Sequence, residues 1–76
     1  MCGIIGFVGT TPAVPHLLSG LRKLEYRGYD SAGIAIASPT EPDIVIRKAV
    51  GKIANLYQAI AGHPLEFEGP IGIGHT

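Results

Sequence analysis

Apolar residues follow two different periods along this 76-residue chain, and the change from one period to the other limits the folds it can adopt. At Asp30 to Ala37 the residues alternate, with Ile34 and Ile36 on one side and small residues on the other, as in a strand between two layers. Before this stretch, apolar residues recur at helical spacing: Val14, Leu17, Leu18, Leu21 and Leu24. The chain therefore mixes helix and strand within one small domain.

The same patterns extend to both ends of the chain. The apolar run from Cys2 to Val8 is rich in β-forming residues on both faces, which predicts a strand buried within a sheet. A short turn at 38–42 separates two strands and predicts an antiparallel hairpin. The complete predicted order is strand, helix, strand, strand, helix and strand, over residues 2–8, 10–28, 30–37, 43–49, 51–61 and 71–76.

Threonine, proline and glycine residues set the expected ends of the helices. Thr10-Thr11-Pro12 predicts the start of the first helix, with threonine as N-cap, and Gly28 is a suitable C-cap. Gly20 lies inside this helix, where glycine costs about 1 kcal/mol relative to alanine, so close packing on a sheet is expected there. The second helix ends at Gly62, and its predicted apolar stripe is formed by Ile53, Leu56, Tyr57 and Ile60.

The last predicted strand stops in the middle of the element. It places Ile71, Ile73 and His75 on one face, and the sequence ends at Thr76. A strand cut there would leave unpaired edge groups, which complete domains avoid. We therefore interpret residues 1–76 as the amino-terminal part of a larger domain.

Composition argues against several classes of partner. Six basic residues balance six acidic ones, so nothing indicates binding to nucleic acid or to an acidic membrane. A single cysteine cannot form an internal disulfide, which suits a cytoplasmic protein. The apolar run after Cys2 is too short to span a bilayer, and no targeting segment is recognisable.

Cys2 is the only cysteine and lies one peptide bond from the amino terminus. If Met1 is removed, a thiol and a free α-amino group share one residue. An α-amino group has a pKa of about 7.7 to 8, low enough to act as a general base near neutral pH. A thiol with a pKa of about 8.5 is only slightly ionised at pH 7 and benefits from such a base. The position thus predicts a nucleophile that carries its own base, provided that Met1 is lost.

Each candidate residue also has a simpler interpretation. A lone cysteine in an apolar strand is most often a small buried hydrophobe. His16 is expected at the solvent edge of the first helix, and His63 in an extended loop before proline. Cys2, His16, His63 and His75 lack the close-spaced ligand pairs of structural zinc sites, so a zinc site is not expected.

Three segments resemble one protein family. Cys2-Gly3-Ile4-Ile5-Gly6 resembles the opening of class II glutamine amidotransferases, which are N-terminal-nucleophile enzymes. The stretch from Gly20 to Ala35 resembles the glutamine–fructose-6-phosphate aminotransferase (isomerizing) family, also called glucosamine-6-phosphate synthases. Gly72-Ile73-Gly74-His75-Thr76 resembles the start of a further motif of that family. The middle segment is the most specific, and it favours this family over other amidotransferases such as amidophosphoribosyltransferase.

The resemblance implies a fold and a reaction. The fold is the four-layer αββα sandwich of N-terminal-nucleophile hydrolases, with mainly antiparallel sheets, to which this chain would supply part of both sheets and two helices. Cys2 would attack the side-chain amide of glutamine, releasing ammonia and leaving a γ-glutamyl thioester that water hydrolyses. The ammonia would convert fructose 6-phosphate to glucosamine 6-phosphate in carboxy-terminal isomerase domains of a homo-oligomeric protein, without a metal or organic cofactor.

The resemblance also assigns roles to further residues. Arg27 and Gly28 match residues beside the nucleophile, and the fixed charge and donors of the Arg27 guanidinium suit a role in orienting it. Asp30 and Ser31 are interpreted as caps of the turn into the next strand. His75 and Thr76 lie in the motif beside the glutamine pocket, where we expect a weak, indirect contribution to substrate binding.

The chain ends before several groups that the family's chemistry requires. Among them are the arginine that holds the glutamine carboxylate, the Asn-Gly of the oxyanion hole and the acidic residue that binds the substrate amino group. Losing one oxyanion donor costs about 10² to 10³ in rate, so residues 1–76 alone are expected to be inactive. Two alternatives stay open: another class II amidotransferase, and a non-enzymatic α/β module whose Gly6–Gly9 segment before the helix binds an anion.

Overall fold

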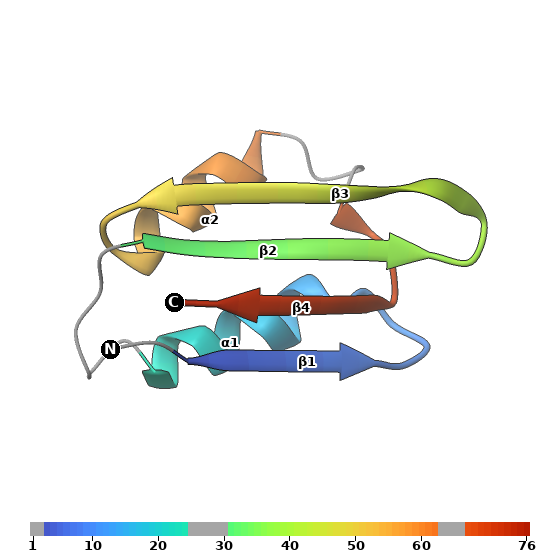
Figure 1. Ribbon diagram of the computed structural model, residues 1–76, viewed down its shortest axis with the longest axis horizontal. Coiled ribbons are helices and arrows are strands. Elements are labelled where there is room, and N and C mark those ends of the chain that lie inside the picture. The colour runs from blue at the N-terminus through green and yellow to red at the C-terminus, as the bar shows by residue number, and fades with distance from the viewer. Residues whose placement is uncertain (1–2, 25–30, 63–66) are drawn as a thin grey trace.

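The described chain forms one four-stranded sheet with two helices on one of its faces (Figure 1). The computed structural model describes residues 3–24, 31–62 and 67–76. Its elements in chain order are β1 (Ile4–Val8), α1 (Val14–Leu24), β2 (Ser31–Ser38), β3 (Glu41–Val50), α2 (Ile53–Ala61) and β4 (Ile71–His75). The predicted α+β class and the predicted order of elements are confirmed.

All neighbouring strands run antiparallel, in the order β1-β4-β2-β3. β2 and β3 form the predicted hairpin, whereas β4 inserts between β1 and β2. The expectation that the strands would divide between two sheets is wrong, because all four described strands belong to one sheet. The expectation of unpaired groups along β4 is wrong as well, since Ile73 lies opposite both Gly6 of β1 and Ala35 of β2.

β1 is an edge strand, which corrects the prediction of a strand buried on both faces. Ile5 and Phe7 pack against the core, but Ile4 and Val8 are 81% and 79% exposed. The apolar run predicts the strand correctly, but it wrongly predicts that both faces of the strand are buried. A pattern of apolar residues cannot tell a strand covered on both faces from one whose second face is apolar and open.

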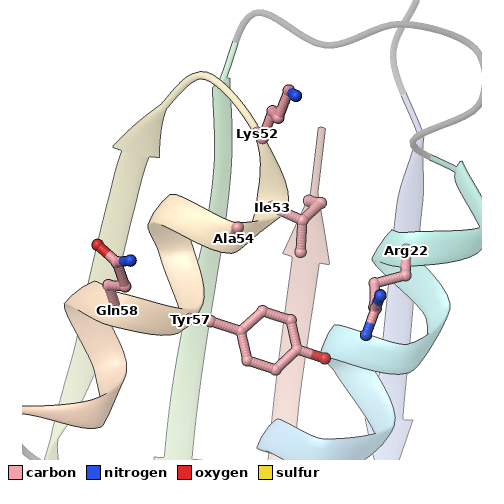
Figure 2. A pocket seen from close by; sticks show the side chains of 6 residues that line it. All are labelled: Arg22, Lys52, Ile53, Ala54, Tyr57 and Gln58. Atoms are coloured by element: carbon pink, nitrogen blue, oxygen red, sulfur yellow. The ribbon is translucent and has the colours of Figure 1, made fainter.

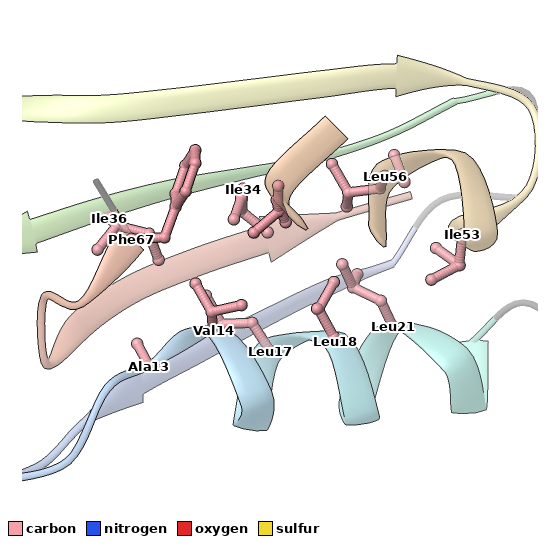
Figure 3. Close-up of a cluster of buried hydrophobic side chains, with 12 residues drawn as sticks. Ala13, Val14, Leu17, Leu18, Leu21, Ile34, Ile36, Ile53, Leu56 and Phe67 are labelled. Carbon is pink, nitrogen blue, oxygen red and sulfur yellow. The ribbon is translucent and has the colours of Figure 1, made fainter. Parts of the chain in front are cut away.

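The two helices lie side by side over the sheet, α1 above β1 and β4, and α2 above β2 and β3 (Figures 1 and 3). Between helices and sheet lies a single apolar core in the described residues. The stripe of α1 is confirmed, and three of the four residues predicted for the stripe of α2 are buried. The buried core residues are Ala13, Val14, Leu17, Leu18, Leu21, Ala32, Ile34, Ile36, Ile53, Leu56, Ile60 and Phe67.

Glycines allow α1 to lie close to the strands beneath it. A Cβ on Gly20 would overlap Cδ1 of Ile5 in β1, which confirms the expected close packing at this glycine. Gly72 in β4 faces the same helix, and a Cβ there would lie 2.9 Å from Cδ1 of Leu17. A side chain at either position would force the neighbouring isoleucine or leucine side chains to shift.

α1 begins at Val14, later than Thr10-Thr11-Pro12 predicts. The residue before the helix is held by a distant loop, because the Ala13 N–H donates to the carbonyl of Gly69 at 2.9 Å. This bond ties the chain ahead of the helix to the segment that leads into β4. Its partner is far away in the sequence, so local capping signals cannot reveal it. The expected C-cap at Gly28 lies outside the described residues.

Two glycines with different backbone conformations flank α2, which begins at Ile53 rather than at the predicted Gly51. Gly51, just before the helix, has a φ of +92°, in the left-handed region that L-residues disfavour. Gly62 ends the helix as predicted, but with a φ of −72° that any residue adopts. Tyr57, predicted on the buried stripe, is instead exposed. The stripe of this helix is therefore narrower than its sequence suggests.

The face of the sheet opposite the helices is apolar and is not covered by the described residues. We name this surface the open face. On β2 it presents only small residues, Gly33 and Ala35, which confirms the predicted bulky and small sides of this strand. Its large apolar side chains, all more than a third exposed, are Ile4, Val8, Ile44, Ile46, Val50, Ile71 and Ile73. The polar residues Lys48 and His75 lie on the same face. A contiguous apolar surface of this kind marks an interaction surface.

Candidate active site

Several predicted site residues lie at the same end of the sheet, where strands begin or end. β4 runs antiparallel to β1 and β2, so β1 and β2 begin where β4 ends (Figure 1). Gly3, Ser31, His75 and Thr76 therefore lie at the same end of the sheet. These residues come from the start, the middle and the end of the sequence.

Gly3 and Thr76 are joined by two hydrogen bonds. The Gly3 N–H donates to Oγ1 of Thr76 at 3.1 Å, and the Thr76 N–H donates to the carbonyl of Gly3 at 3.0 Å. Leu24, the last residue of α1, also packs on Gly3, because a Cβ there would lie 2.6 Å from its Cδ1. Gly3 is thus held by the end of β4 and covered by the end of α1.

His75 lies on the open face, next to Gly33 of β2. It is exposed and pairs with Ile4 on one side and Gly33 on the other. A Cβ on Gly33 would lie only 2.8 Å from Nε2 of His75, so this glycine leaves room for the imidazole. The structure therefore brings His75 and Thr76 to the same end of the sheet. Thr76 is hydrogen-bonded to Gly3, and His75 lies on the open face.

Cys2, Arg27 and Gly28, predicted to carry the chemistry, lie outside the described residues, as do Asp30 and His63. Gly3 follows Cys2 directly in the chain, and Leu24 directly precedes the segment 25–30. Because Gly3 and Leu24 are in contact, the chain enters that segment beside the residue that follows Cys2. The roles assigned to Cys2, Arg27 and Gly28 stay predictions.

His16 is exposed, as predicted, and lies away from this end of the sheet. Its ring stacks on Phe7, near the other end of β1, with 4.1 Å between ring centroids and an interplanar angle of 6°. Its Nε2 lies 3.4 Å from Oγ1 of Thr11. The stacked rings join α1 to β1 near the carboxyl end of that strand, so His16 contributes to helix–sheet packing.

A pocket that the sequence did not indicate lies between α1 and α2 (Figure 2). Its volume is about 360 Å³, and its lining residues are Arg22, Lys52, Ile53, Ala54, Tyr57 and Gln58. The Tyr57 ring reaches from α2 towards Arg22 of α1, whose guanidinium carbon lies 5.8 Å from the ring centroid. The pocket lies on the helix side of the sheet, and neither His75 nor Thr76, the predicted site residues within the described ranges, lines it.

The described ranges contain neither a cluster of metal-binding side chains nor a helix that could span a membrane. No three His, Cys, Asp or Glu side chains in these ranges gather closely enough to hold a metal ion. None of the described helices combines the length and the apolar character needed to cross a bilayer. The expectation that no metal or cofactor is needed stays a prediction.

Known proteins resemble the chain along its whole length. It is 54% identical to the glutamine–fructose-6-phosphate aminotransferase (isomerizing) of a Thermus thermophilus strain, and 53% identical to the protein of that name from Brucella abortus. The protein of that name from Gluconobacter oxydans is 54% identical. Each match covers all 76 residues but only 12% of the relative, so the chain spans about an eighth of their length. No protein-family model matches the chain.

These matches define the class of the chain. The chain is about 50% identical to these relatives over its whole length, so it is homologous to the amino-terminal part of an aminotransferase. Over all 76 residues, the chain matches the amino-terminal part of glutamine–fructose-6-phosphate aminotransferases (isomerizing). The resemblance seen in the sequence is thereby confirmed at the level of the family.

Proposed function

We propose that residues 1–76 are the nucleophile-bearing part of a class II glutamine amidotransferase domain in a glucosamine-6-phosphate synthase. After removal of Met1, the α-amino group of Cys2 takes the thiol proton and the thiolate attacks the side-chain amide carbon of glutamine. The same proton then passes to the departing nitrogen, which leaves as ammonia. Water then hydrolyses the γ-glutamyl thioester to glutamate. The ammonia converts fructose 6-phosphate to glucosamine 6-phosphate elsewhere in the protein. The observation that carries this proposal is the 54% identity across all 76 residues to a relative of that name.

The geometry around Gly3 supports a role for its neighbour Cys2. Chain termini are poorly ordered unless they are tied down, and a nucleophile on the first residue needs a fixed position. Gly3 has two hydrogen bonds to Thr76 and a contact with Leu24. In this proposal Arg27, in the segment that follows Leu24, orients the nucleophile through its guanidinium, with Gly28 beside it.

The open face supports a sandwich fold for the complete domain. In a β-sandwich the inner faces of two sheets interdigitate and form a second apolar layer. The open face has the composition of such an inner face, with Ile44, Ile46 and Ile73 projecting from it. We propose that a second sheet, formed by other parts of the protein, covers it and completes the αββα arrangement of N-terminal-nucleophile hydrolases.

Residues 1–76 alone are proposed to be inactive. The proposed reaction needs groups that bind the glutamine carboxylate and stabilise the oxyanion, and the oxyanion donors alone contribute about 10² to 10³ each. The zero net charge and single cysteine support a cytoplasmic enzyme that binds neither nucleic acid nor membrane. Measurable glutaminase turnover by the 76-residue chain would contradict its proposed inactivity.

The test uses a chimera in which residues 1–76 replace the matching segment of the Thermus thermophilus relative. The chimera is treated with a glutamine analogue that carries an electrophilic diazoketone in place of the side-chain amide. We expect amino-terminal sequencing to begin at Cys2, and mass spectrometry to find the analogue on that residue. A Cys2→Ser variant should neither be labelled there nor release ammonia from glutamine.

Two outcomes would overturn the proposal. One is a chimera that retains Met1 and still hydrolyses glutamine at the rate of the parent enzyme, because the α-amino base would then be an amide. The other is an active chimera whose Cys2 is not labelled. Thr40→Ala, in the turn at the far end of the sheet, is the control and should leave both labelling and turnover unchanged.

A further inference from the structure

The contact between Gly3 and Thr76 continues the ladder between β1 and β4 by one pair. The last regular pair is Ile4 with His75, so Gly3 and Thr76 are the next residues in register. Directly opposed residues in a hydrogen-bonded antiparallel pair exchange two backbone bonds. Here the Thr76 N–H donates to the Gly3 carbonyl, but the Gly3 N–H donates to the side-chain oxygen of Thr76.

A side-chain hydroxyl thus replaces a backbone carbonyl at the final rung. The Gly3 nitrogen belongs to the peptide bond that joins Cys2 to Gly3, and the atoms of a peptide unit lie in one plane. A bond that fixes the direction of the Gly3 N–H therefore restricts the orientation of the whole unit, up to the α-carbon of Cys2. The proposed nucleophile is attached to that α-carbon.

We infer that Thr76 is a positioning residue for Cys2, acting through its hydroxyl on the Gly3 N–H; this inference rests on the function proposed above. It replaces the expected indirect contribution of Thr76 to substrate binding with a contribution to the placement of the nucleophile. Leu24 supports the same placement by packing on Gly3. A misplacement of about 1 Å at a reacting group costs about 10²-fold in rate, which sets the scale of the effect.

Thr76→Val removes the hydroxyl and keeps the shape of the side chain, whereas Thr76→Ser keeps the hydroxyl. In the chimera, we expect Thr76→Val to lower kcat for glutamine hydrolysis about 10- to 100-fold and to change KM less than about threefold. Thr76→Ser should restore kcat to within about threefold of the parent chimera. Thr40→Val is the matched control, because it removes a threonine hydroxyl that bonds Ser38 at 3.0 Å in the turn at the other end of the sheet.

A second measurement follows the Gly3 amide without any need for activity. In the 76-residue chain, NMR relaxation should give Gly3 an order parameter near about 0.85, and Thr76→Val should lower it below about 0.6. Hydrogen exchange at this amide should accelerate in the same variant and not in Thr40→Val.

Each outcome decides between explanations. An active chimera whose Thr76→Val form keeps full kcat overturns the inference and leaves the proposed function standing. A raised KM with unchanged kcat assigns Thr76 to substrate binding and also overturns it. An unchanged Gly3 order parameter in Thr76→Val shows that the hydroxyl does not hold this amide. A chimera that is inactive with Thr76 in place overturns the proposed function instead.

Discussion

Gly20 of α1 and Ile5 of β1 share one small space between the helix and the sheet. A methyl group on Gly20 would overlap Cδ1 of Ile5 and lie 3.2 Å from its Cγ1. At this glycine, α1 therefore lies directly against the side chain of Ile5 in β1. Its position inside a helix is unfavourable by itself, by about 1 kcal/mol relative to alanine.

We predict that Gly20→Ala destabilises the 76-residue chain, although alanine is the better helix former. Overpacking a well-filled site costs about 1 to 3 kcal/mol, which exceeds the gain in helix propensity. Urea unfolding followed by circular dichroism should therefore show a lower free energy of unfolding.

The companion variant is Ile5→Val, which removes the Cδ1 atom that alanine would meet. Alone it should cost about 0.5 to 1.5 kcal/mol, as expected for the loss of one methyl group. The double variant should be more stable than the sum of the two single effects, because the overlap is relieved. Strict additivity would show that Gly20 and Ile5 do not compete for this space.

A second prediction concerns the glycines at either end of α2. Gly51→Ala should destabilise the chain by about 1 to 2 kcal/mol, because Gly51 has a φ of +92° and a Cβ would lie 2.8 Å from Nδ2 of Asn55. Gly62→Ala should stabilise it by about 0.4 to 1 kcal/mol, since its φ is −72° and, among the described residues outside its own helix and chain neighbours, no atom lies within 4 Å of the added Cβ. Thermal unfolding of the two variants measures both signs, and equal shifts would contradict the assignment of the left-handed position to Gly51 alone.

The sequence predicted the local elements because their signals are local. The stripe from Val14 to Leu21 and the two sides of β2 depend on periods that neighbouring residues display, and both are confirmed. The start of α1 was predicted too early because the Ala13 N–H is bonded to Gly69, which is far away in the chain. Gly62 ends α2 as predicted, but the sequence could not show that Gly51 has a positive φ, because the identity of a residue as glycine does not fix its backbone conformation.

The arrangement of the sheet and of the site was not predictable in the same way. The insertion of β4 between β1 and β2 depends on pairing between residues at opposite ends of the chain, such as Ile5 and Gly74. The same pairing creates the bond between Gly3 and Thr76. Family resemblance placed Thr76 near the site, but only the register shows which atom it holds.

A third prediction tests whether the open face is an inner layer of the complete domain. Ile73 in β4 is 58% exposed and lies on the open face, whereas Ile34 in β2 is 2% exposed and lies in the core. Both strands have a neighbour on each side, so Ile73→Thr and Ile34→Thr form a matched pair. In the 76-residue chain, Ile34→Thr should cost about 2 to 4 kcal/mol, whereas Ile73→Thr should cost less than about 1 kcal/mol.

In the chimera, the two substitutions should lower the free energy of unfolding by similar amounts. If a second sheet covers the open face, Ile73→Thr removes a buried side chain and buries a hydroxyl, so its cost should rise to about 2 to 4 kcal/mol. Ile34→Thr should cost the same in both settings, because the two helices already cover it. Denaturant unfolding of the two variants in both proteins gives the comparison. An Ile73→Thr substitution that stays nearly neutral in an active chimera would show that this face is not an inner layer, and the four-layer arrangement would have to be abandoned while the glutaminase assignment stood.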